Sequence, residues 1–288
     1  MADISSLLGD PPPSLKIVDV GAMEIGSPPY APLLELPTAT VIGFEPNPEE
    51  CAKLNAKQVA SHRYVPSFVG DGSKRTFHWC NWAATSSLYP PNRRVLDRFT
   101  ELPEFVQLEG TSEVETARLD DIPECEGADF IKIDVQGATL DVLRGGQATV
   151  SRALVVQCEV EFIPIYEGEP LFAEVDQEMR RLGFLFHQFT RLAARTFAPL
   201  NRRPGAPGQG AGQVIWTDAV YVRSFLDLQA LQPVELVKLA FILDRLYQSH
   251  DLALLAFQHH DAKTGGDLWD RYANLLTGGV PVEKPPMP

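Results

Sequence analysis

Short apolar runs that suit buried strands alternate with helix-like segments over the first two thirds of the chain. Four runs stand out, at Leu15–Val20, Thr40–Phe44, Phe130–Ile133 and Ala153–Val160. Uninterrupted apolar runs of this length are typical of strands that are buried on both faces of a parallel sheet. Parallel strands that alternate with helices are joined by right-handed crossovers. The pattern therefore predicts an open α/β sheet with helices on both faces.

The segments between these runs carry helix start and stop signals. Ser27-Pro28 has the pattern of an N-cap followed by proline at the first helical position, and Asn47–Glu50 repeats it with acidic residues near the positive end of the helix dipole. Ala138–Arg144 predicts a short helix. The helical spacing of apolar residues over Pro170–Leu182 predicts a longer one that ends at Gly183.

Two segments break this alternation. Residues 73–118 have the pattern of an irregular or hairpin insertion, and residues 201–212, rich in glycine and proline, predict a flexible loop. The second segment separates Phe184–Phe189 from Gln213–Val222, whose alternating apolar residues are typical of strands. We expect these two to form an antiparallel hairpin that closes the sheet.

The chain changes character from Pro233 onward. A first helix is predicted by the spacing of Leu236, Leu239, Leu243 and Leu246. Two more helices are predicted over Asp251–His260 and Asp267–Leu276, and the residues from Pro281 onward are expected to be disordered. We therefore expect an α/β domain over residues 1–228 and a helical extension over residues 229–288. The apolar stripe of that extension has to be buried, by packing within the chain or in a homo-oligomer.

The composition narrows the class of partner. The formal net charge of −13 disfavours a general nucleic-acid binder, because neutralising phosphates needs clustered Lys and Arg. No apolar run suits a membrane span, and Met1–Asp10 lacks the basic and apolar parts of a secretory signal. The 4 cysteines include no C-x-x-C pair, so neither a disulfide framework nor a zinc knuckle is indicated. These features predict a cytoplasmic protein without membrane or nucleic-acid partners.

The junction after the first strand has the features of an adenosine site. Gly21 follows the strand directly, where a glycine lets backbone approach a ligand closely, and the helix expected next would point free N–H groups at the same space. Glu45 stands at the end of the second strand, where an acid can accept hydrogen bonds from both ribose hydroxyls. The alternative is that Gly21 serves only a tight turn and Glu45 is a solvated loop acid.

Charge distinguishes between two ligands for such a site. A dinucleotide enzyme would share this geometry, but no G-x-G-x-x-G occurs here. The Asp19 carboxylate, close before Gly21, would face a pyrophosphate poorly and would suit a cationic amino group. Complementarity of charge therefore favours S-adenosylmethionine over NAD.

At this point the sequence resembles the FkbM-type S-adenosylmethionine-dependent methyltransferases. The most specific stretch is Asp129–Gly145, in which lysine, aspartate and glycine are followed by a short helix. Five further pieces resemble the family in the same order along the chain, at Thr116–Asp121, Val155–Tyr166, Leu171-Phe172, Gly183-Phe184 and Asp218–Val222. The likeness covers about residues 15–225.

The resemblance implies a class I methyltransferase fold, which is a Rossmann-like, mostly parallel seven-stranded sheet with an antiparallel last strand. It implies S-adenosylmethionine as methyl donor, and an acceptor hydroxyl on a sugar, a polyketide or another small metabolite. Asp19, Gly21 and Ala22 would then line the methionine part of the donor, Glu45 its ribose, and Asp71 its adenine.

Two positions depart from the pattern of the family. The usual glycine loop reads Asp-x-Gly-x-Asn-x-Gly, whereas Met23 stands here in place of the asparagine and the second glycine, Gly26, comes one place late. The signature also commonly carries glutamate where Gln136 stands. The loop after Gly21 is therefore expected to be one residue longer than in the family, with Ser27 or Glu24 substituting for the missing asparagine.

Methylation of a hydroxyl requires a group that removes its proton, and Asp134 at the end of the third of the four runs is the first candidate. The alternative is that Asp134 binds the donor's amino group or caps the following helix. Lys132 shares its strand face and can pair with it. Glu159 and Glu161 are expected to reach the same cleft, where one of them could hold a hydroxyl or a divalent ion. Together with Asp134 they would offer the oxygen ligands that Mg²⁺ accepts, but their spacing is not diagnostic and we assign no metal.

Other polar and aromatic residues are weaker candidates. His187 is expected to be a hydrogen-bonded, half-buried histidine, and His259-His260-Asp261 to lie on a helix surface. Ser86–Leu88 resembles a Ser-Ser-Leu of the family. The aromatic residues around it are expected to form either a wall over the acceptor or a packed hairpin core; they are Trp79, Trp82 and Tyr89.

The sequence thus predicts a methyltransferase that acts on a small or glycosidic acceptor. Two rival functions stay open. One is a binding protein on a degenerate methyltransferase fold, suggested by Met23 and the late Gly26. The other is a nicotinamide-dependent oxidoreductase.

Overall fold

The four apolar runs form neighbouring parallel strands of one sheet. The computed structural model describes residues 4–198 and 212–286. The runs become β1 (Leu15–Val20), β2 (Ala39–Phe44), β7 (Phe130–Ile133) and β8 (Val155–Glu161). Each pairs in parallel with its neighbour in the order β2-β1-β7-β8, which confirms the parallel sheet.

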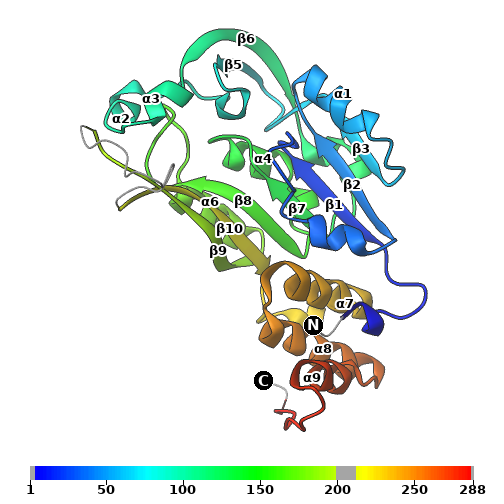
Figure 1. Ribbon diagram of the computed structural model, residues 1–288. Helices are drawn as coiled ribbons and strands as arrows, with labels where there is room; N and C mark the ends of the chain where they lie inside the picture. The colour runs from blue at the N-terminus through cyan, green and yellow to red at the C-terminus, as the bar shows by residue number, and fades with distance from the viewer. Residues whose placement is uncertain (1–3, 199–211, 287–288) are drawn as a thin grey trace.

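Three further strands complete this sheet. In the described part of the chain its order is β3-β2-β1-β7-β8-β10-β9, with β3 at His62–Val65. The outer pair, β9 (Phe184–Arg195) and β10 (Gln213–Arg223), is antiparallel, and β10 runs antiparallel to β8. The predicted hairpin therefore closes the sheet, and the class I methyltransferase fold is confirmed (Figure 1). The loop predicted over residues 201–212 lies outside the described residues except for Gly212.

Helices cover both faces of the sheet. The α-helices are α1 (Pro48–Ala56), α2 (Arg93–Leu96), α3 (Leu102–Phe105), α4 (Thr139–Gly145), α5 (Gln147–Val150), α6 (Phe172–Arg181), α7 (Pro233–Ile242), α8 (His250–Thr264) and α9 (Leu268–Thr277). A π-helix, Leu243–Tyr247, continues α7. Short 3-10 turns lie at Ile4–Leu7, Ala31–Glu35, Ala83–Thr85, Leu119–Asp121, Pro123–Cys125 and Leu228–Ala230.

The insertion forms a small second sheet above the main one. Strands β5 (Lys74–Cys80) and β6 (Leu108–Ala117) pair as an antiparallel hairpin, which confirms that part of the prediction. A short strand, β4 (Phe68–Val69), pairs in parallel with β6. Helices α2 and α3 lie between β5 and β6 in the sequence, and Figure 1 shows them beside the hairpin at the same end of the molecule.

The α-helix predicted from Ser27-Pro28 is wrong. The chain between β1 and β2 contains only a 3-10 turn, Ala31–Glu35, whose cap residue is Tyr30. Pro29 and Pro32 lack the backbone N–H that a regular helix needs, and each ring crowds the preceding turn. By contrast, Asn47 caps α1 as predicted, since its side chain accepts from the N–H groups of Glu49 and Glu50.

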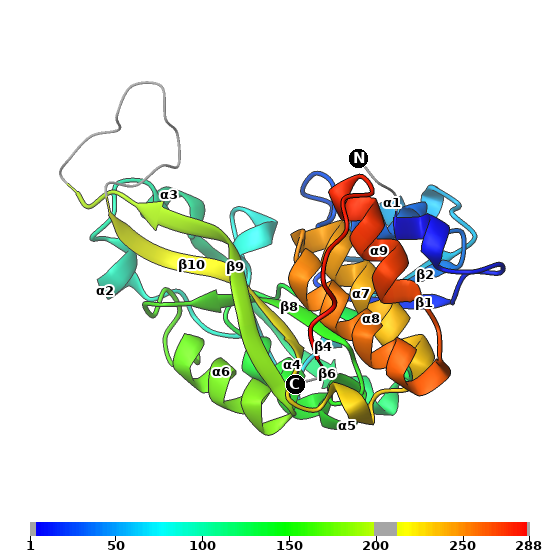
Figure 2. The ribbon, with the colours of Figure 1, turned by 90° about the horizontal axis from the view of Figure 1, so that it is seen from below.

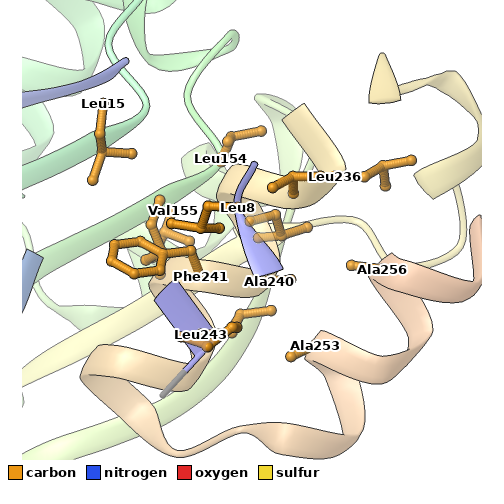
Figure 3. Close-up of a cluster of buried hydrophobic side chains, with 14 of the residues drawn as sticks. Leu8, Leu15, Leu154, Val155, Leu236, Ala240, Phe241, Leu243, Ala253 and Ala256 are labelled. Atoms are coloured by element: carbon orange, nitrogen blue, oxygen red, sulfur yellow. The ribbon is translucent and has the colours of Figure 1, made fainter. Parts of the chain in front are cut away.

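One face of the sheet is consequently left without a helix from this connection, and the C-terminal helices cover it. Ile17, Phe130 and Val155 lie in one buried cluster with Phe241 and Phe257 of α7 and α8. Figure 3 shows Phe241 beside Val155, with Leu236 next to Leu154. The apolar stripe of the helical region is thus buried within its own chain, so this stripe gives no reason to expect a homo-oligomer.

The opposite face packs on α4 and α6. Val18, Ile42 and Ile131, each one place along from a residue of the first cluster, lie in a second buried cluster with Val142 and Met179. The alternation follows from the strand period of two, which sends successive side chains to opposite faces. Figure 2 shows α6 on the side of the sheet away from α7–α9.

Because the C-terminal helices complete the core, we expect Leu236→Ala to destabilise the whole α/β sheet. Leu236 is 0% exposed, and its truncation should lower the free energy of unfolding by about 2–3 kcal/mol. Leu226→Ala is the matched control, because Leu226 is 69% exposed and its loss should cost no more than about 0.5 kcal/mol. Urea unfolding followed by circular dichroism measures both. Equal midpoints for the two variants would contradict the shared core.

The prediction that His259-His260-Asp261 lies on a helix surface is also wrong. His259 and Asp261 are buried in α8 beneath α9 and the chain end. The Asp261 carboxylate accepts from the N–H groups of Leu268 and Trp269 at 3.0 and 2.9 Å. Asp261 therefore satisfies the free N–H groups at the start of α9, which is a structural role.

Candidate active site

A cavity of about 720 Å³ opens where the parallel strands end. Gly21 after β1, Glu45 after β2, Asp134 after β7 and Glu159 near the end of β8 all line it. Trp79 and Trp82 of the insertion line it as well. The volume falls in the range of small-molecule sites, and the carboxyl ends of parallel strands are where such folds bind ligands.

The turn after β1 is fixed by a close approach of two backbones. Gly21 has φ +80°, and a Cβ there would lie 1.9 Å from the carbonyl oxygen of Asp134. The glycine is therefore required by the neighbouring strand end rather than by a ligand. Since no α-helix follows it, the predicted helix dipole at this turn is absent from the structure. Ala22 and Gly26 also line the cavity, and Gly26 has φ +80° in open space.

Asp19 and Lys132 form a buried ion pair at the floor of the cavity. Lys132 Nζ lies 3.1 Å from Asp19 Oδ1 and donates to the carbonyl oxygen of Gly21 at 2.5 Å. The Tyr30 hydroxyl donates to Asp19 Oδ2 at 2.7 Å. Both carboxylate oxygens of Asp19 thus face partners within the chain. Asp19 therefore has a counter-ion within the chain, Lys132, which the charge argument from the sequence did not include.

The protonation of this pair follows from its surroundings. Burial alone would lower the pKa of Lys132, but the carboxylates of Asp19 and Asp134 outweigh it and hold the pKa above its ordinary value. Burial also raises the pKa of Asp19, and the Lys132 ammonium and the Tyr30 hydroxyl oppose that rise. With an ammonium and a hydroxyl directed at its carboxylate, the pair is ionised. Lys132 therefore remains a cation and cannot accept a proton.

Glu45 lies at the cavity wall where β2 ends. Its side chain is 2% exposed, and its Oε1 accepts from the N–H of Asn47 at 2.8 Å. Burial raises the pKa of Glu45, while the hydrogen bond from Asn47 opposes the rise. The alternative of a solvated loop acid is therefore wrong.

Gln136 joins the two candidate catalytic carboxylates. Its Nε2 donates to Asp134 Oδ1 at 3.1 Å and to Glu159 Oε1 at 2.7 Å. Lys132 Nζ lies 3.6 Å from Asp134 Oδ2, as the shared strand face predicted. The Asp134 side chain is 39% exposed, which leaves it open to the cavity. Two carboxylates, one amide and one cation therefore meet at a single place.

The turn that presents Gln136 has left-handed backbone. Gln136 has φ +50° and Gly137 has φ +78°. Glu161 accepts from the N–H of Gly137 at 3.1 Å, and Ser87 donates its hydroxyl to the carbonyl of Gln136 at 2.5 Å. Ser87 thus ties the insertion to the turn. Glu161 supports the turn from below and, contrary to expectation, does not line the cavity.

Three carboxyls in this region have raised pKa values. Burial and the charge of Asp134 raise the pKa of Glu159 well above its ordinary value. Burial raises the pKa of Glu161 to about 7 and that of Glu169 to about 9. Glu169 lies against the same turn, since a Cβ on Gly137 would meet its Oε2 at 2.4 Å. The folded protein therefore binds protons that the unfolded chain releases.

This difference predicts that stability falls as pH rises. Between about pH 4.5, where an unfolded glutamate titrates, and pH 7 to 9, where Glu161 and Glu169 titrate, the native state binds more protons. We expect Glu169→Gln to remove part of this dependence, so its melting temperature should exceed that of the wild type by several degrees at pH 9 but not at pH 5. Thermal unfolding across this range is the measurement. The exposed Glu167→Gln serves as control, and a constant difference between wild type and Glu169→Gln would contradict the assignment.

Several sequence candidates lie elsewhere. Asp71 does not line the cavity, because its carboxylate accepts from the N–H and hydroxyl of Ser73 in the loop after β4. Tyr89 instead donates to Asp141 at 2.8 Å, whereas Trp79 and Trp82 do line the cavity. His187 is outside it too, and within the described residues its buried Nε2 has no hydrogen-bond partner.

Other cavity residues were not singled out from the sequence. Gln157, Asp218 and Trp216 line it from β8 and β10, and Arg191 and Arg195 line it from β9. Gln157 and Asp218 belong to the segments that resemble the family, Val155–Tyr166 and Asp218–Val222. Strand alternation alone does not tell which polar residue of such a segment faces a ligand. The arginines carried no motif at all.

The described residues, 4–198 and 212–286, contain no cluster of three or more His, Cys, Asp or Glu side chains that suits a metal ion. Among the same residues, no helix has the length and apolar character needed to cross a membrane.

Comparison with solved structures finds distant likenesses. A magnesium protoporphyrin IX methyltransferase (ChlM) from Synechocystis PCC 6803 matches 77% of this chain and 76% of its own, at a TM-score of 0.37 and 12% identity. A precorrin-6y C5,15-methyltransferase from Geobacter metallireducens GS-15 matches 73% and 80%, at a TM-score of 0.38 and 12% identity. These likenesses are too distant to bear on function.

Sequence comparison gives a nearer relative and a family. The chain is 32% identical over 187 residues to the 2-O-methyltransferase NoeI of Sinorhizobium fredii. The matched region covers 60% of this chain and 74% of that protein. The family model described as the methyltransferase FkbM domain matches residues 19–186, more than half of the chain and the whole stretch from Asp19 to the Gln136 turn and β8. The chain therefore belongs to the FkbM family of methyltransferases.

Proposed function

We propose that this S-adenosylmethionine-dependent methyltransferase transfers the methyl group to a hydroxyl of a sugar or a related small acceptor. The observation that carries the proposal is the pair of carboxylates, Asp134 and Glu159, joined by Gln136 at the open end of the cavity. Carboxylates placed in this way can both hold a hydroxyl and take its proton. The relative NoeI is described as a 2-O-methyltransferase, which supports oxygen as the acceptor atom.

The residues present fit the donor. The buried Glu45 carboxylate can accept hydrogen bonds from the two ribose hydroxyls, as in other folds of this type. Beyond it, Tyr64, Ser67 and Phe68 line the cavity with flat and polar surface that suits a purine. On the other side of Glu45, the Gly21–Gly26 segment lines the space for the methionine part. Asp71 has no place in this arrangement.

The bound donor supplies a methyl carbon made electrophilic by a positively charged sulfur. The acceptor oxygen forms a bond to that carbon as the bond from carbon to sulfur breaks, and the hydroxyl proton passes to a carboxylate. We assign this proton to Asp134, whose side chain is open to the cavity. Glu159, with its raised pKa, holds the acceptor hydroxyl or shares the proton with Asp134. Lys132 keeps Asp134 and Asp19 in position as their common cation.

Titration calorimetry with S-adenosylhomocysteine tests the donor site. We expect binding to the wild type and about tenfold weaker binding to Glu45→Gln, because a hydrogen bond to a charged acceptor is lost. The exposed Glu49→Gln on α1 is the matched control and should bind as the wild type does. No binding at millimolar ligand would overturn the proposal in favour of an inert binding protein. Stabilisation by NAD alone would favour a nicotinamide enzyme.

The acceptor is tested by transfer of a radiolabelled methyl group to a panel of hydroxylated metabolites and oligosaccharides. A labelled product in which the methyl group is attached to oxygen is the expected result. A product labelled only on nitrogen or carbon would contradict the assignment of an O-methyltransferase.

A further inference from the structure

Two arginines line one end of the cavity in a protein whose formal net charge is −13. Both Arg191 and Arg195 belong to β9, the outer strand of the closing hairpin. The other charged groups that reach the floor of the cavity are mostly carboxylates, which are Asp19, Asp134, Glu159 and Asp218. The cavity thus has an acidic floor and a cationic end, and the cationic end requires an explanation.

Arg195 is held in place by an aromatic ring. Its guanidinium carbon lies 4.3 Å from the ring centroid of Trp216, and Nη1 donates to the carbonyl of Ala194 at 2.9 Å. Trp216 itself lines the cavity. A guanidinium that lies over a tryptophan face is stabilised there and held in one orientation.

Arg191 is exposed and stands close to both Arg195 and Asp218. Of the residues that the structure describes, none forms an ion pair with Arg191. Burial lowers the pKa of Arg195, the carboxylate of Glu101 opposes that shift, and the charge of Arg191 lowers the pKa by a smaller amount. The two guanidinium groups therefore lie close enough to repel each other, and Glu101 offsets this repulsion at Arg195. A bound anion would relieve this repulsion.

The sheet order places this end on the acceptor side. The donor residues Gly21 and Glu45 follow β1 and β2, whereas β9 lies four strand steps from β1, or about 19 Å at ordinary strand spacing. From Glu159 on β8 to β9 the distance is two steps, or about 10 Å. Asp218 on β10 pairs with Glu159 and lies between them. A group held by the arginines would therefore belong to the acceptor and not to the donor.

We propose that Arg191 and Arg195, with Trp216, form a subsite for an anionic group on the acceptor, on the β9 side of the hydroxyl that is methylated. The inference rests on the proposed function and deepens it, since it names the substrate class as an anionic glycoside. Carboxylate, sulfate and phosphate share the chemistry, because each offers oxygens to the planar guanidinium donors.

Binding of inorganic pyrophosphate, used as the probe anion, tests the subsite directly. Calorimetry is performed on the full-length protein saturated with S-adenosylhomocysteine, so a failure of the donor site is seen separately. We expect pyrophosphate to bind the wild type and Arg191→Gln to weaken it about tenfold, with Arg191→Lys intermediate. Arg180→Gln on α6, where Arg180 pairs with Asp176 outside the cavity, is the control and should bind as the wild type does. Arg195→Gln should weaken pyrophosphate binding as Arg191→Gln does. Because Arg195→Gln also loses the contact with Trp216 and could fail to fold, the test depends on the variant of the exposed Arg191.

Matched acceptors then identify which anion is used. The methyl-transfer assay compares three pairs of acceptors. The first pair is a uronic-acid disaccharide with its methyl ester, the second a sulfated with a desulfated oligosaccharide, and the third a nucleotide sugar with the free sugar. The anionic member of one pair should have a kcat/KM at least about tenfold higher, and Arg191→Gln should abolish that preference through KM. If S-adenosylhomocysteine binds but pyrophosphate does not, or if Arg191→Gln leaves pyrophosphate affinity unchanged, the subsite is refuted while the proposed function stands.

Discussion

Asp134→Asn should lower kcat by about 100-fold or more, while the affinity for S-adenosylhomocysteine changes by less than about threefold. The asparagine Oδ1 can still accept from Gln136 Nε2, as Asp134 does at 3.1 Å, so the local geometry is retained. What is lost is the group that takes the hydroxyl proton. Initial rates with an acceptor found in the methyl-transfer screen give kcat and KM, and calorimetry gives the affinity.

Two controls separate this role from others. Asp121→Asn, whose side chain is 72% exposed outside the cavity, should be as active as the wild type. Glu159→Gln should also reduce turnover, but it should act on the KM of the acceptor as well, since we place Glu159 at the acceptor hydroxyl. If Asp134→Asn instead loses affinity for S-adenosylhomocysteine and keeps its kcat, Asp134 binds the donor's amino group and is not the base.

Gly21→Ala should be the most destabilising single-methyl change in the cavity wall. The added Cβ would lie 1.9 Å from the Asp134 carbonyl oxygen, and the residue would keep φ at +80°. A left-handed residue costs about 1–2 kcal/mol and crowding of backbone adds about 1–3 kcal/mol, so we expect a loss of about 4 kcal/mol in the free energy of unfolding. The turn would have to move away from β7, so binding of S-adenosylhomocysteine should be lost as well.

Gly26→Ala is a close control for this change. Gly26 has the same φ of +80°, but nothing lies within 4 Å of the added Cβ. Only the conformational cost of about 1–2 kcal/mol applies there. Denaturant unfolding of the two variants compares strain alone with strain plus a clash. Equal losses would show that the approach of Gly21 to Asp134 is not what makes this glycine necessary.

Much of the sheet was predictable because buried parallel strands have a local signature. Phe130–Ile133 and Leu15–Val20 carry apolar residues on both faces, and the structure assigns the same bounds to β7 and β1. The Asn47-Pro48 start of α1 was predictable for the same reason, since a cap is formed by adjacent residues. The helix expected from Ser27-Pro28 failed because later prolines in the segment outweigh a good start signal.

The site was predictable only in part, because its chemistry depends on contacts between distant strands. Glu45 and Asp134 follow strands and so were placed at the cavity by position alone. The partner of Asp19 is Lys132, 113 positions further along, and no local pattern shows that the two side chains pair. Likewise, nothing near Arg191 in the sequence indicates that this residue of β9 lines the cavity. Charge arguments made from one segment therefore fail where a second segment supplies the counter-ion.

The covering of β1 by helices from the other end of the chain has a consequence for biosynthesis. Ile17 on β1 and Tyr272 on α9 belong to one buried cluster. This face of β1 can therefore be buried only after α9 has been synthesised. At about 5–20 residues per second, ribosomes leave that strand face exposed for some tens of seconds. We expect nascent chains to need chaperone protection during this interval. A fusion partner would then be tolerated better after Lys284 than in place of the final helices.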